Sequence, residues 1–282
     1  MNGLRTGIRS LGAPSAAAAL VVLTWVVTAA QPPSRTGERP HFPSVANLRI
    51  NLASHAAATP SWAGYVVVAP SSSKVTGVAG GWTVPRVSCA LPGHRSTEAA
   101  EWVGVDGYNT TTVQQAGTET ACIKGRPTYY AWVEMFAANA KNAGTQRDLG
   151  VDAYPVQPGD SMYATVTAPI GGDGRWQLAI TNLTEGWAYR AALRASEKVA
   201  EHTAEWIVER PTMPGGASKQ VPLSHIGVVG FSDADYSLGT RSVSLSATKS
   251  ALALKMSIGG ADCEAPTDTD DNSNGFRVIP GR

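Results

Sequence analysis

The stretch that decides the fold is Ala204-Glu205-Trp206-Ile207-Val208-Glu209, in which acidic and apolar side chains alternate. Successive side chains of a β-strand point to opposite faces. We therefore expect the alanine, the tryptophan and the valine on one face, and Glu205, Ile207 and Glu209 on the other. Two carboxylates then share one face of a sheet.

The rest of the chain predicts an all-β, antiparallel sandwich of two large sheets. Glycine occurs 29 times and proline 18 times, and no long segment has helical periodicity. Short alternating segments between turn signals are typical of antiparallel sandwiches. The expected strands cover residues 64–68, 75–84, 99–105, 111–116, 128–136, 161–167, 176–181, 188–195, 202–209, 221–231, 242–247, 252–258 and 276–279.

Composition excludes some classes of function. Charged residues make up 16% of the chain and the net charge is +1, which does not favour binding to nucleic acid. The five histidines have no metal-ligand spacing, so we expect no metal and no cofactor. We expect a monomer.

The amino terminus is typical of a signal peptide over residues 1–30. Arg5 and Arg9 precede an apolar run from about residue 16 to residue 27, and Thr28-Ala29-Ala30 supplies small residues for cleavage. The alternative is a single membrane anchor, but the run is shorter than the roughly 20 residues that span a bilayer. The sequence thus predicts a secreted, extracellular protein without stable membrane association after cleavage.

Residues 31–59 form a proline-containing and mainly basic segment, which reads as a propeptide or as a disordered linker. The positive charge of such a propeptide would be complementary to an acidic cleft. The folded domain is expected over residues 60–282.

Six segments along the chain resemble the glutamic peptidases, or eqolisins (peptidase family G1), a family of secreted endopeptidases that act in acid. Any one segment alone has little specificity, but the ordered set is distinctive. The segments are Ser61-Trp62-Ala63-Gly64-Tyr65, Gly81-Trp82-Thr83-Val84-Pro85, Trp102-Val103-Gly104-Val105-Asp106-Gly107, Gln115-Ala116-Gly117, Tyr130-Ala131-Trp132-Val133-Glu134 and Ala204-Glu205-Trp206-Ile207-Val208-Glu209.

The resemblance implies a concave, substrate-holding sheet face and a catalytic pair, Gln115 and Glu209. A carboxylate can take a proton from an attacking water and return it to the leaving amine. A carboxamide can donate to the oxyanion of the tetrahedral intermediate without titrating. We expect the two side chains to converge from neighbouring strands. Gln114 competes with Gln115, but strand alternation places it on the opposite face.

A supporting shell is expected around this pair. By resemblance, Trp62, Trp102, Asp106 and Glu134 line the cleft or hold the water, and alternation puts Trp102 with Asp106 and Trp132 with Glu134. Asp106 and Glu134 also have a simpler interpretation, because acids near strand ends often accept bonds from backbone amides. The predicted supporting residues are Trp62, Trp102, Asp106, Trp132, Glu134 and Glu205.

The three cysteines allow at most one intramolecular disulfide. Cys89 and Cys122 flank the strands that carry Trp102 and Gln115, so we expect these two to pair and Cys263 to remain a free thiol.

Two other functions remain open at this point. Tryptophans on a concave sheet also suit sugar rings, as in a lectin-like sandwich. A glycoside hydrolase could use Glu209 with Glu134 or Glu205 as its carboxylate pair. The favoured reading is a peptidase whose partners are polypeptide substrates.

Overall fold

The computed structural model describes Ala53 and residues 55–90, 96–137, 146–169, 174–212 and 220–281. The predicted signal peptide and most of the predicted propeptide lie outside these residues. All regular secondary structure in the described part is β. Its strands are β1 (Ala57–Thr59), β2 (Trp62–Val68), β3 (Val75–Thr83), β4 (Val87–Ser88), β5 (Thr97–Val105), β6 (Thr112–Ile123), β7 (Arg126–Ala137), β8 (Arg147–Asp148), β9 (Ser161–Thr167), β10 (Arg175–Asn182), β11 (Trp187–Arg194), β12 (Thr203–Glu209), β13 (His225–Ile226), β14 (Val229–Leu238), β15 (Arg241–Ser244), β16 (Leu252–Ile258), β17 (Ala261–Pro266) and β18 (Phe276–Pro280).

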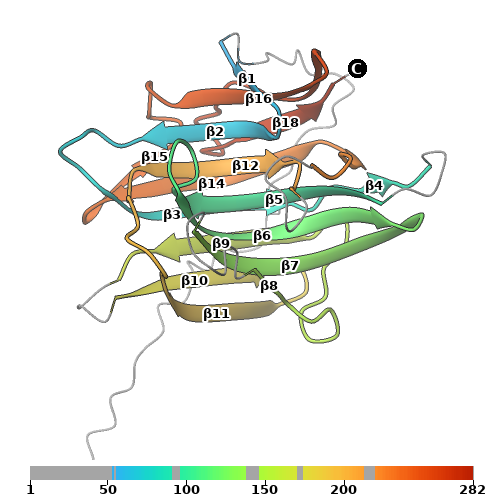
Figure 1. Ribbon diagram of the computed structural model, residues 1–282, viewed down its shortest axis with the longest axis horizontal. Helices are drawn as coiled ribbons and strands as arrows, with labels where there is room; N and C mark the ends of the chain where they lie inside the picture. The colour runs from blue at the N-terminus through green and yellow to red at the C-terminus, as the bar shows by residue number, and fades with distance from the viewer. Residues whose placement is uncertain are drawn as a thin grey trace, which may run out of the picture. The chain divides into compact units, whose positions relative to one another are not determined.

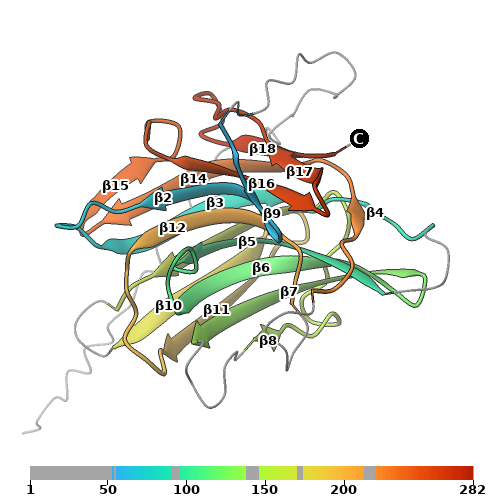
Figure 2. The ribbon, with the colours of Figure 1, turned by 45° about the horizontal axis from the view of Figure 1, so that its top comes forward.

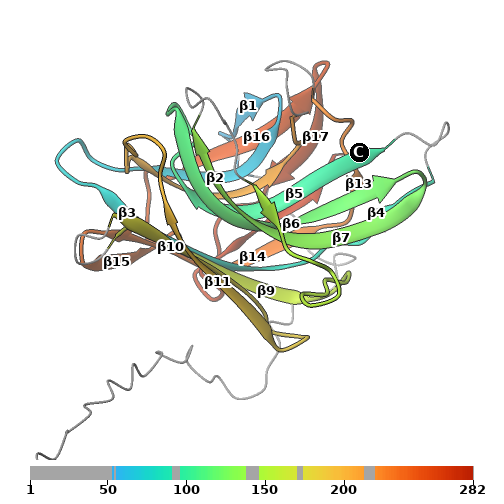
Figure 3. The ribbon, with the colours of Figure 1, turned by 60° about the horizontal axis from the view of Figure 1, so that its bottom comes forward.

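The strands form an antiparallel sandwich, as the sequence predicts. One large sheet runs in the order β11-β10-β9-β3-β14-β18-β17-β16-β2-β12-β5-β6-β7-β8 and turns back over itself (Figures 1 and 3). One layer holds β9, β10, β11, β3 and β14, and the other holds β2, β12, β5, β6 and β7. The strands β16 to β18 join the two layers at one edge (Figure 2).

Alternating side chains fill the space between the layers. In β10 the apolar residues Leu178 and Ile180 are buried while their neighbours are more exposed, which is the pattern of a strand with one face in a core. From the other layer, Val103, Val133 and Trp206 belong to the same buried cluster. This core fixes which face of β5, β6, β7 and β12 is turned outward.

The outward face of that second layer carries an apolar cluster of its own. Trp102, Trp132, Ile207 and Val113 are buried there, and Trp62 packs against them. The sequence prediction that Ala204, Trp206 and Val208 face away from Glu205, Ile207 and Glu209 is thereby confirmed. Large buried tryptophans outside the main core indicate a lined hollow rather than an ordinary solvated sheet face.

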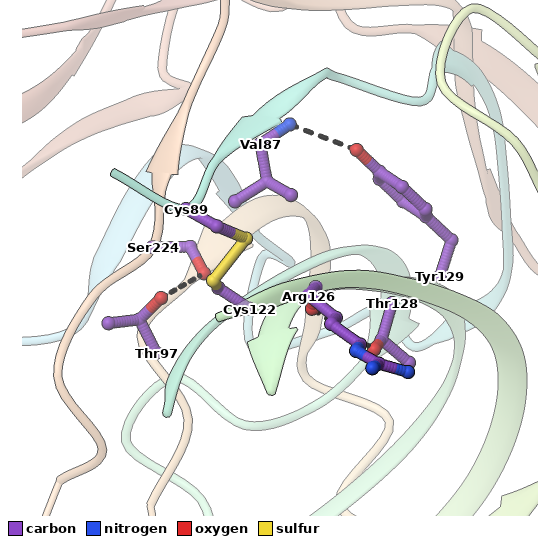
Figure 4. The surroundings of a disulfide bond; sticks show 8 residues. All are labelled: Val87, Cys89, Thr97, Cys122, Arg126, Thr128, Tyr129 and Ser224. Atoms are coloured by element: carbon purple, nitrogen blue, oxygen red, sulfur yellow. Dashed lines mark hydrogen bonds between the residues drawn. A yellow bond between two sulfur atoms is a disulfide. The ribbon is translucent and has the colours of Figure 1, made fainter. Parts of the chain in front are cut away.

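A disulfide ties the far end of β6 to the segment before β5. The expected bond between Cys89 and Cys122 is present, with a Cα–Cα distance of 5.6 Å across 33 residues (Figure 4). Beside it the Thr97 and Ser224 hydroxyls are hydrogen bonded at 3.0 Å. Closing a loop of this size contributes about 3 to 4 kcal/mol in the chain-entropy model. Cys263 is a free thiol.

Most predicted strand boundaries differ from the observed ones by up to three residues, β1, β4, β8 and β17 were not predicted, and two segments differ more strongly. The segment 221–231 is not one strand, because β13 ends at Ile226 and β14 starts at Val229. The strand predicted to end at Ala116 continues through Gly117 to Ile123 as β6. In the described part of the chain no helix is long and apolar enough to cross a membrane.

Candidate active site

A cleft of about 310 Å³ lies on the outward face of β5, β6 and β7, where β12 ends. The strand register determines which residues lie side by side at the bottom of the cleft. Glu209 pairs with Ala100 of β5, and Ala100 pairs with Glu119 of β6. The side chains that give the cleft its chemical character are Trp62, Gln115, Glu119, Trp132, Glu134 and Glu209.

Glu209 is the last residue of β12 and is held by two tryptophans. The Trp102 indole Nε1 donates to Glu209 Oε2 at 2.9 Å, and the Trp62 side chain also hydrogen bonds to this carboxyl. The two rings meet edge to face with centroids 5.2 Å apart. The pKa of Glu209 is raised from 4.5 to about 7, mainly by burial and also by the nearby Glu134, against the lowering effect of both indole bonds.

Gln115 lies on β6 directly across from Glu134 of β7. Its Nε2 donates to Glu134 Oε2 at 2.6 Å, and its side chain is 7% exposed. The pKa of Glu134 is raised mainly by burial, and the Gln115 bond acts in the opposite direction. A carboxamide nitrogen carries two hydrogens, so one remains for another acceptor.

Gln115 and Glu209 do not come from neighbouring strands. The strand β5 lies between β6 and β12, and this corrects the expected arrangement. Both side chains nevertheless line the same cleft. Gly117 makes room for two tryptophans, because an added Cβ there would lie 2.6 Å from Trp102 Cβ and 2.8 Å from Trp132 Cζ2.

Trp132 lines the cleft with Glu134, as alternation along β7 predicts. Its ring is 3% exposed, and within the described residues its buried Nε1 has no hydrogen-bond partner. Gln114, in contrast, is only 1% exposed and is not among the residues of the cleft.

Asp106 lies away from the cleft, contrary to the expected grouping with Trp102. The strand β5 ends at Val105, and Asp106 has a φ of 64°, which breaks the alternation. Its carboxylate accepts from the backbone amides of Glu201 at 2.8 Å and His202 at 2.7 Å. Asp106 is therefore an acid near a strand end that accepts hydrogen bonds from backbone amides. In this way it fixes the chain segment before β12.

Glu205 shares a strand face with Glu209 but has 0% exposure and does not line the cleft. It accepts from the Tyr108 amide at 2.7 Å and from the Thr203 hydroxyl at 2.8 Å. Burial raises its pKa well above the ordinary value. Glu205 thus fixes the turn that follows β5. Gly107 belongs to this turn and lines the cleft.

Glu119 is the cleft residue that the sequence analysis missed. It lies four residues after Gln115 on the same face of β6, and it is 4% exposed. The signal was available, since alternation from Gln115 through Gly117 leads to Glu119. Glu119 was missed because the predicted strand ended at Ala116.

Comparison with known proteins places this geometry in a family. Residues 60–273 match the Peptidase A4 family. Aspergillopepsin-2 of Aspergillus niger is 28% identical over 215 residues, which cover 70% of this chain and 71% of that protein.

Two solved structures share the fold. The crystal structure of scytalido-glutamic peptidase with a transition state analog inhibitor has a TM-score of 0.65 and 23% identity, and it covers 78% of this chain and 98% of that one. Aspergilloglutamic peptidase from Aspergillus niger has a TM-score of 0.53 and 23% identity, with coverages of 65% and 99%.

Proposed function

Because the chain belongs to the Peptidase A4 family and is therefore a peptidase, we propose that it cleaves polypeptides internally at acid pH with Glu209 and Gln115 as its catalytic pair. The observation that carries the proposal is a carboxyl with a raised pKa and a carboxamide that donates one of its two hydrogens to Glu134, both lining one cleft. The similarity to relatives named as glutamic peptidases supports a glutamate in the central role.

The reaction needs one proton to move twice. Glu209 takes a proton from water as the water oxygen attacks the scissile carbonyl carbon. The carbonyl oxygen becomes an oxyanion, which accepts the second hydrogen of Gln115 Nε2. Glu209 then gives its proton to the amide nitrogen, the C–N bond breaks, and the products are a carboxyl and an amine.

Glu134 has two effects on this pair. Its bond to Gln115 Nε2 holds the carboxamide in one orientation, so that little reorganisation is needed when the oxyanion forms. Its charge also raises the pKa of Glu209. Two carboxyls that interact in this way lose their protons in separate steps.

We take the working form to be the one in which Glu209 and Glu134 hold a single proton between them, and its reactive microstate to be the one with this proton on Glu134 and with an ionised Glu209 that can accept a proton from water. At high pH the pair loses this last proton, and at low pH it takes up a second. Activity should therefore have a maximum on the acid side of about pH 7, which is the pKa of Glu209.

Export is a separate part of the proposal. The signal-like residues 1–30 and the disulfide between Cys89 and Cys122 both favour an oxidising compartment outside the cytosol. We propose that the protein is secreted, that it matures by removal of a propeptide within residues 31–59, and that it acts as a monomer.

The glycoside hydrolase alternative loses one of its carboxylate pairs. Glu205 is sealed from the cleft, so it is not placed to act with Glu209 on a sugar. The pair Glu209 and Glu134 remains available to such an enzyme, but a glycosidase has no need of Gln115.

The test is to incubate the processed protein with a denatured protein, and separately with mixed polysaccharides, at several pH values from about 3 to 8. Mass spectrometry should find internal peptide fragments and no released sugar. Gln115→Ala should abolish most of the cleavage, whereas Gln114→Ala should not. Sugar release, or peptide cleavage that survives the loss of Gln115, would refute the proposal.

A further inference from the structure

One buried carboxyl in the cleft has no partner and takes no part in the proposed mechanism. Glu119 is 4% exposed and lines the cleft, and no described residue donates a hydrogen bond to its buried Oε1. Leaving a buried polar atom unpaired costs free energy, and this cost is hard to explain unless something else supplies the partner.

The charges of the described residues that shift the pKa of Glu119 are all negative. Glu98, Glu101, Glu209 and Asp148 each act on it and raise its pKa, after the larger effect of burial. Glu98 is on β5, on the same face as Ala100, and Asp148 of β8 pairs with Trp132 of β7.

The residue that pairs with Glu119 on the next strand is affected by the same negative charges. Tyr130 of β7 pairs with Glu119, and burial together with Glu119, Asp148 and Glu98 raises its pKa. We call Glu98, Glu119, Tyr130 and Asp148 the acidic end; of these four residues, Glu119 lines the cleft.

Among the described residues, the two arginines next to these acids are engaged elsewhere. Arg147 is next to Asp148, but its guanidinium donates to the Tyr189 hydroxyl at 2.9 Å. Arg210 follows Glu209 and is engaged by the Val221 carbonyl and the Gln220 side chain, at 2.6 Å and 2.8 Å. In the described ranges no group of three or more acidic, histidine or cysteine side chains is arranged to hold a metal ion.

The acidic end adjoins the catalytic acid. Register places Glu209, Ala100, Glu119 and Tyr130 in one row across four strands. Neighbouring strands lie about 4.8 Å apart, so the backbones at Glu209 and Glu119 are about 10 Å apart with only the small Ala100 side chain between them. A substrate side chain next to the scissile bond can occupy that space.

We propose that Glu119 is a specificity-determining residue, which binds a lysine or arginine side chain of the substrate at a position adjoining the scissile bond. This inference rests on the proposed peptidase function. The cationic end would pair with Glu119, with Glu98 and Asp148 adding attraction, while the aliphatic stem would pack against Tyr130 and Trp132.

The unpaired Nε1 of Trp132 supports a ligand in the same place. Its ring is 3% exposed and lines the cleft, and this buried donor has no partner among the described residues. A substrate backbone carbonyl could accept its hydrogen. The face of a tryptophan also attracts a cation.

The binding should be linked to pH. In the free protein burial, and after it the surrounding acids, raise the pKa of Glu119 well above its ordinary value of 4.5. A bound ammonium or guanidinium stabilises the ionised form, so binding releases a proton. The preference for a basic side chain should therefore grow as the pH rises from about 4 to 7, by at most about tenfold per pH unit.

The experiment uses peptides of identical sequence that carry lysine or norleucine, placed in turn before and after the scissile bond. At about pH 6 the wild-type enzyme should cleave the lysine peptide with a kcat/KM at least about tenfold higher at one of the two positions. Glu119→Gln should remove this preference, so that the variant cleaves the lysine and norleucine peptides with kcat/KM values within about twofold of each other.

Glu264→Gln is the matched control. Glu264 is also a buried glutamate, 2% exposed and with an unpaired Oε2, but it lies on β17 and does not line the cleft. This variant should keep the preference. Equal cleavage of the two peptides by wild type, or a preference that survives Glu119→Gln, would overturn the proposal.

A binding measurement separates this inference from the peptidase function. In Glu209→Gln, calorimetry in buffers of different ionisation enthalpy should detect more proton release with the lysine peptide than with the norleucine peptide. If wild type cleaves no peptide yet this difference is found, the peptidase proposal fails and the subsite stands. If wild type cleaves both peptides equally and no difference is found, the subsite alone fails.

Discussion

The two faces of the layer formed by β5, β6, β7 and β12 both contain buried carboxyls, and they use them differently. Glu209 on the outward face has a pKa raised to about 7, and Glu101 on the inward face has a pKa raised to about 8. Glu101 accepts from Thr118 at 2.8 Å and from Thr120 at 3.1 Å inside the sandwich, where no substrate can reach it.

The difference shows that a raised pKa does not by itself identify a catalytic group. Burial is the largest cause for both glutamates. What separates them is access, because Glu209 lines a cleft that also holds Gln115, and Glu101 does not. The first carboxyl is placed to exchange its proton with a substrate, and the second can only affect stability.

The largest expected effect is on turnover when Glu209 is replaced. Glu209→Gln keeps the shape of the side chain and its place beside the indoles but cannot exchange a proton, so kcat should fall by about 10³-fold or more. Glu101→Gln should keep kcat within about threefold. Steady-state kinetics on one peptide compares the two variants. Equal losses would remove the distinction between the faces.

A second pair of variants compares the two faces of β6. Gln115→Ala should lower kcat by about 10²- to 10³-fold with little change in KM, because its hydrogen bond forms in the transition state. Gln114→Ala removes a buried side chain from the opposite face and should lower stability rather than kcat. The comparison fails if Gln114→Ala reduces kcat as strongly as Gln115→Ala.

Stability should depend on pH through the acids that face the interior. Glu101 and Glu264 each have a folded-state pKa of about 8 against an ordinary value of 4.5. Between these values the unfolded chain releases protons that the folded chain retains. The free energy of unfolding should therefore be greatest below about pH 4.5 and should fall by a few kcal/mol as the pH rises to about 8.

Urea unfolding at about pH 4, 6 and 8 measures this slope. Glu101→Gln should make the slope smaller, because one of the titrating groups is gone. Stability that stays constant or increases over this range would contradict the assignment of these carboxyls as buried and protonated.

The smallest expected effect is a shift of the activity profile. Glu134→Gln removes a negative charge that raises the pKa of Glu209. The pKa of Glu209, as it shows in the pH profile of kcat/KM, should then move to lower pH by less than about one unit. A full pH profile of the variant measures the shift, and a limb that moves to higher pH would show that the two carboxyls are not coupled as proposed.

Much of the fold follows from the sequence, because alternation is a local property. The period of two in β12 predicts correctly which side chains enter the core, and the same holds for Trp132 and Glu134 on β7. The strands β9 and β16 have the predicted bounds. Short alternating segments bounded by turn residues carry their own signal.

The sequence predictions fail where a single backbone angle or a tertiary contact determines the position of a side chain. Alternation is valid only within a strand, and the φ of 64° at Asp106 ends it one residue early. The sequence places Glu205 on the correct face but does not show that the turn at Gly107 and Tyr108 covers it. The order of the strands is also non-local, which is why β5 was not expected between β6 and β12.

The most direct test of the account is a titration of the Glu209 carboxyl itself. Carbon NMR of protein labelled at the glutamate side chains, with the resonance assigned by its loss in Glu209→Gln, reports the protonation of this group. The account predicts a midpoint near pH 7 that coincides with the fall of kcat/KM on the alkaline side. A midpoint near the ordinary value of 4.5, or a limb of activity unrelated to it, would contradict the account.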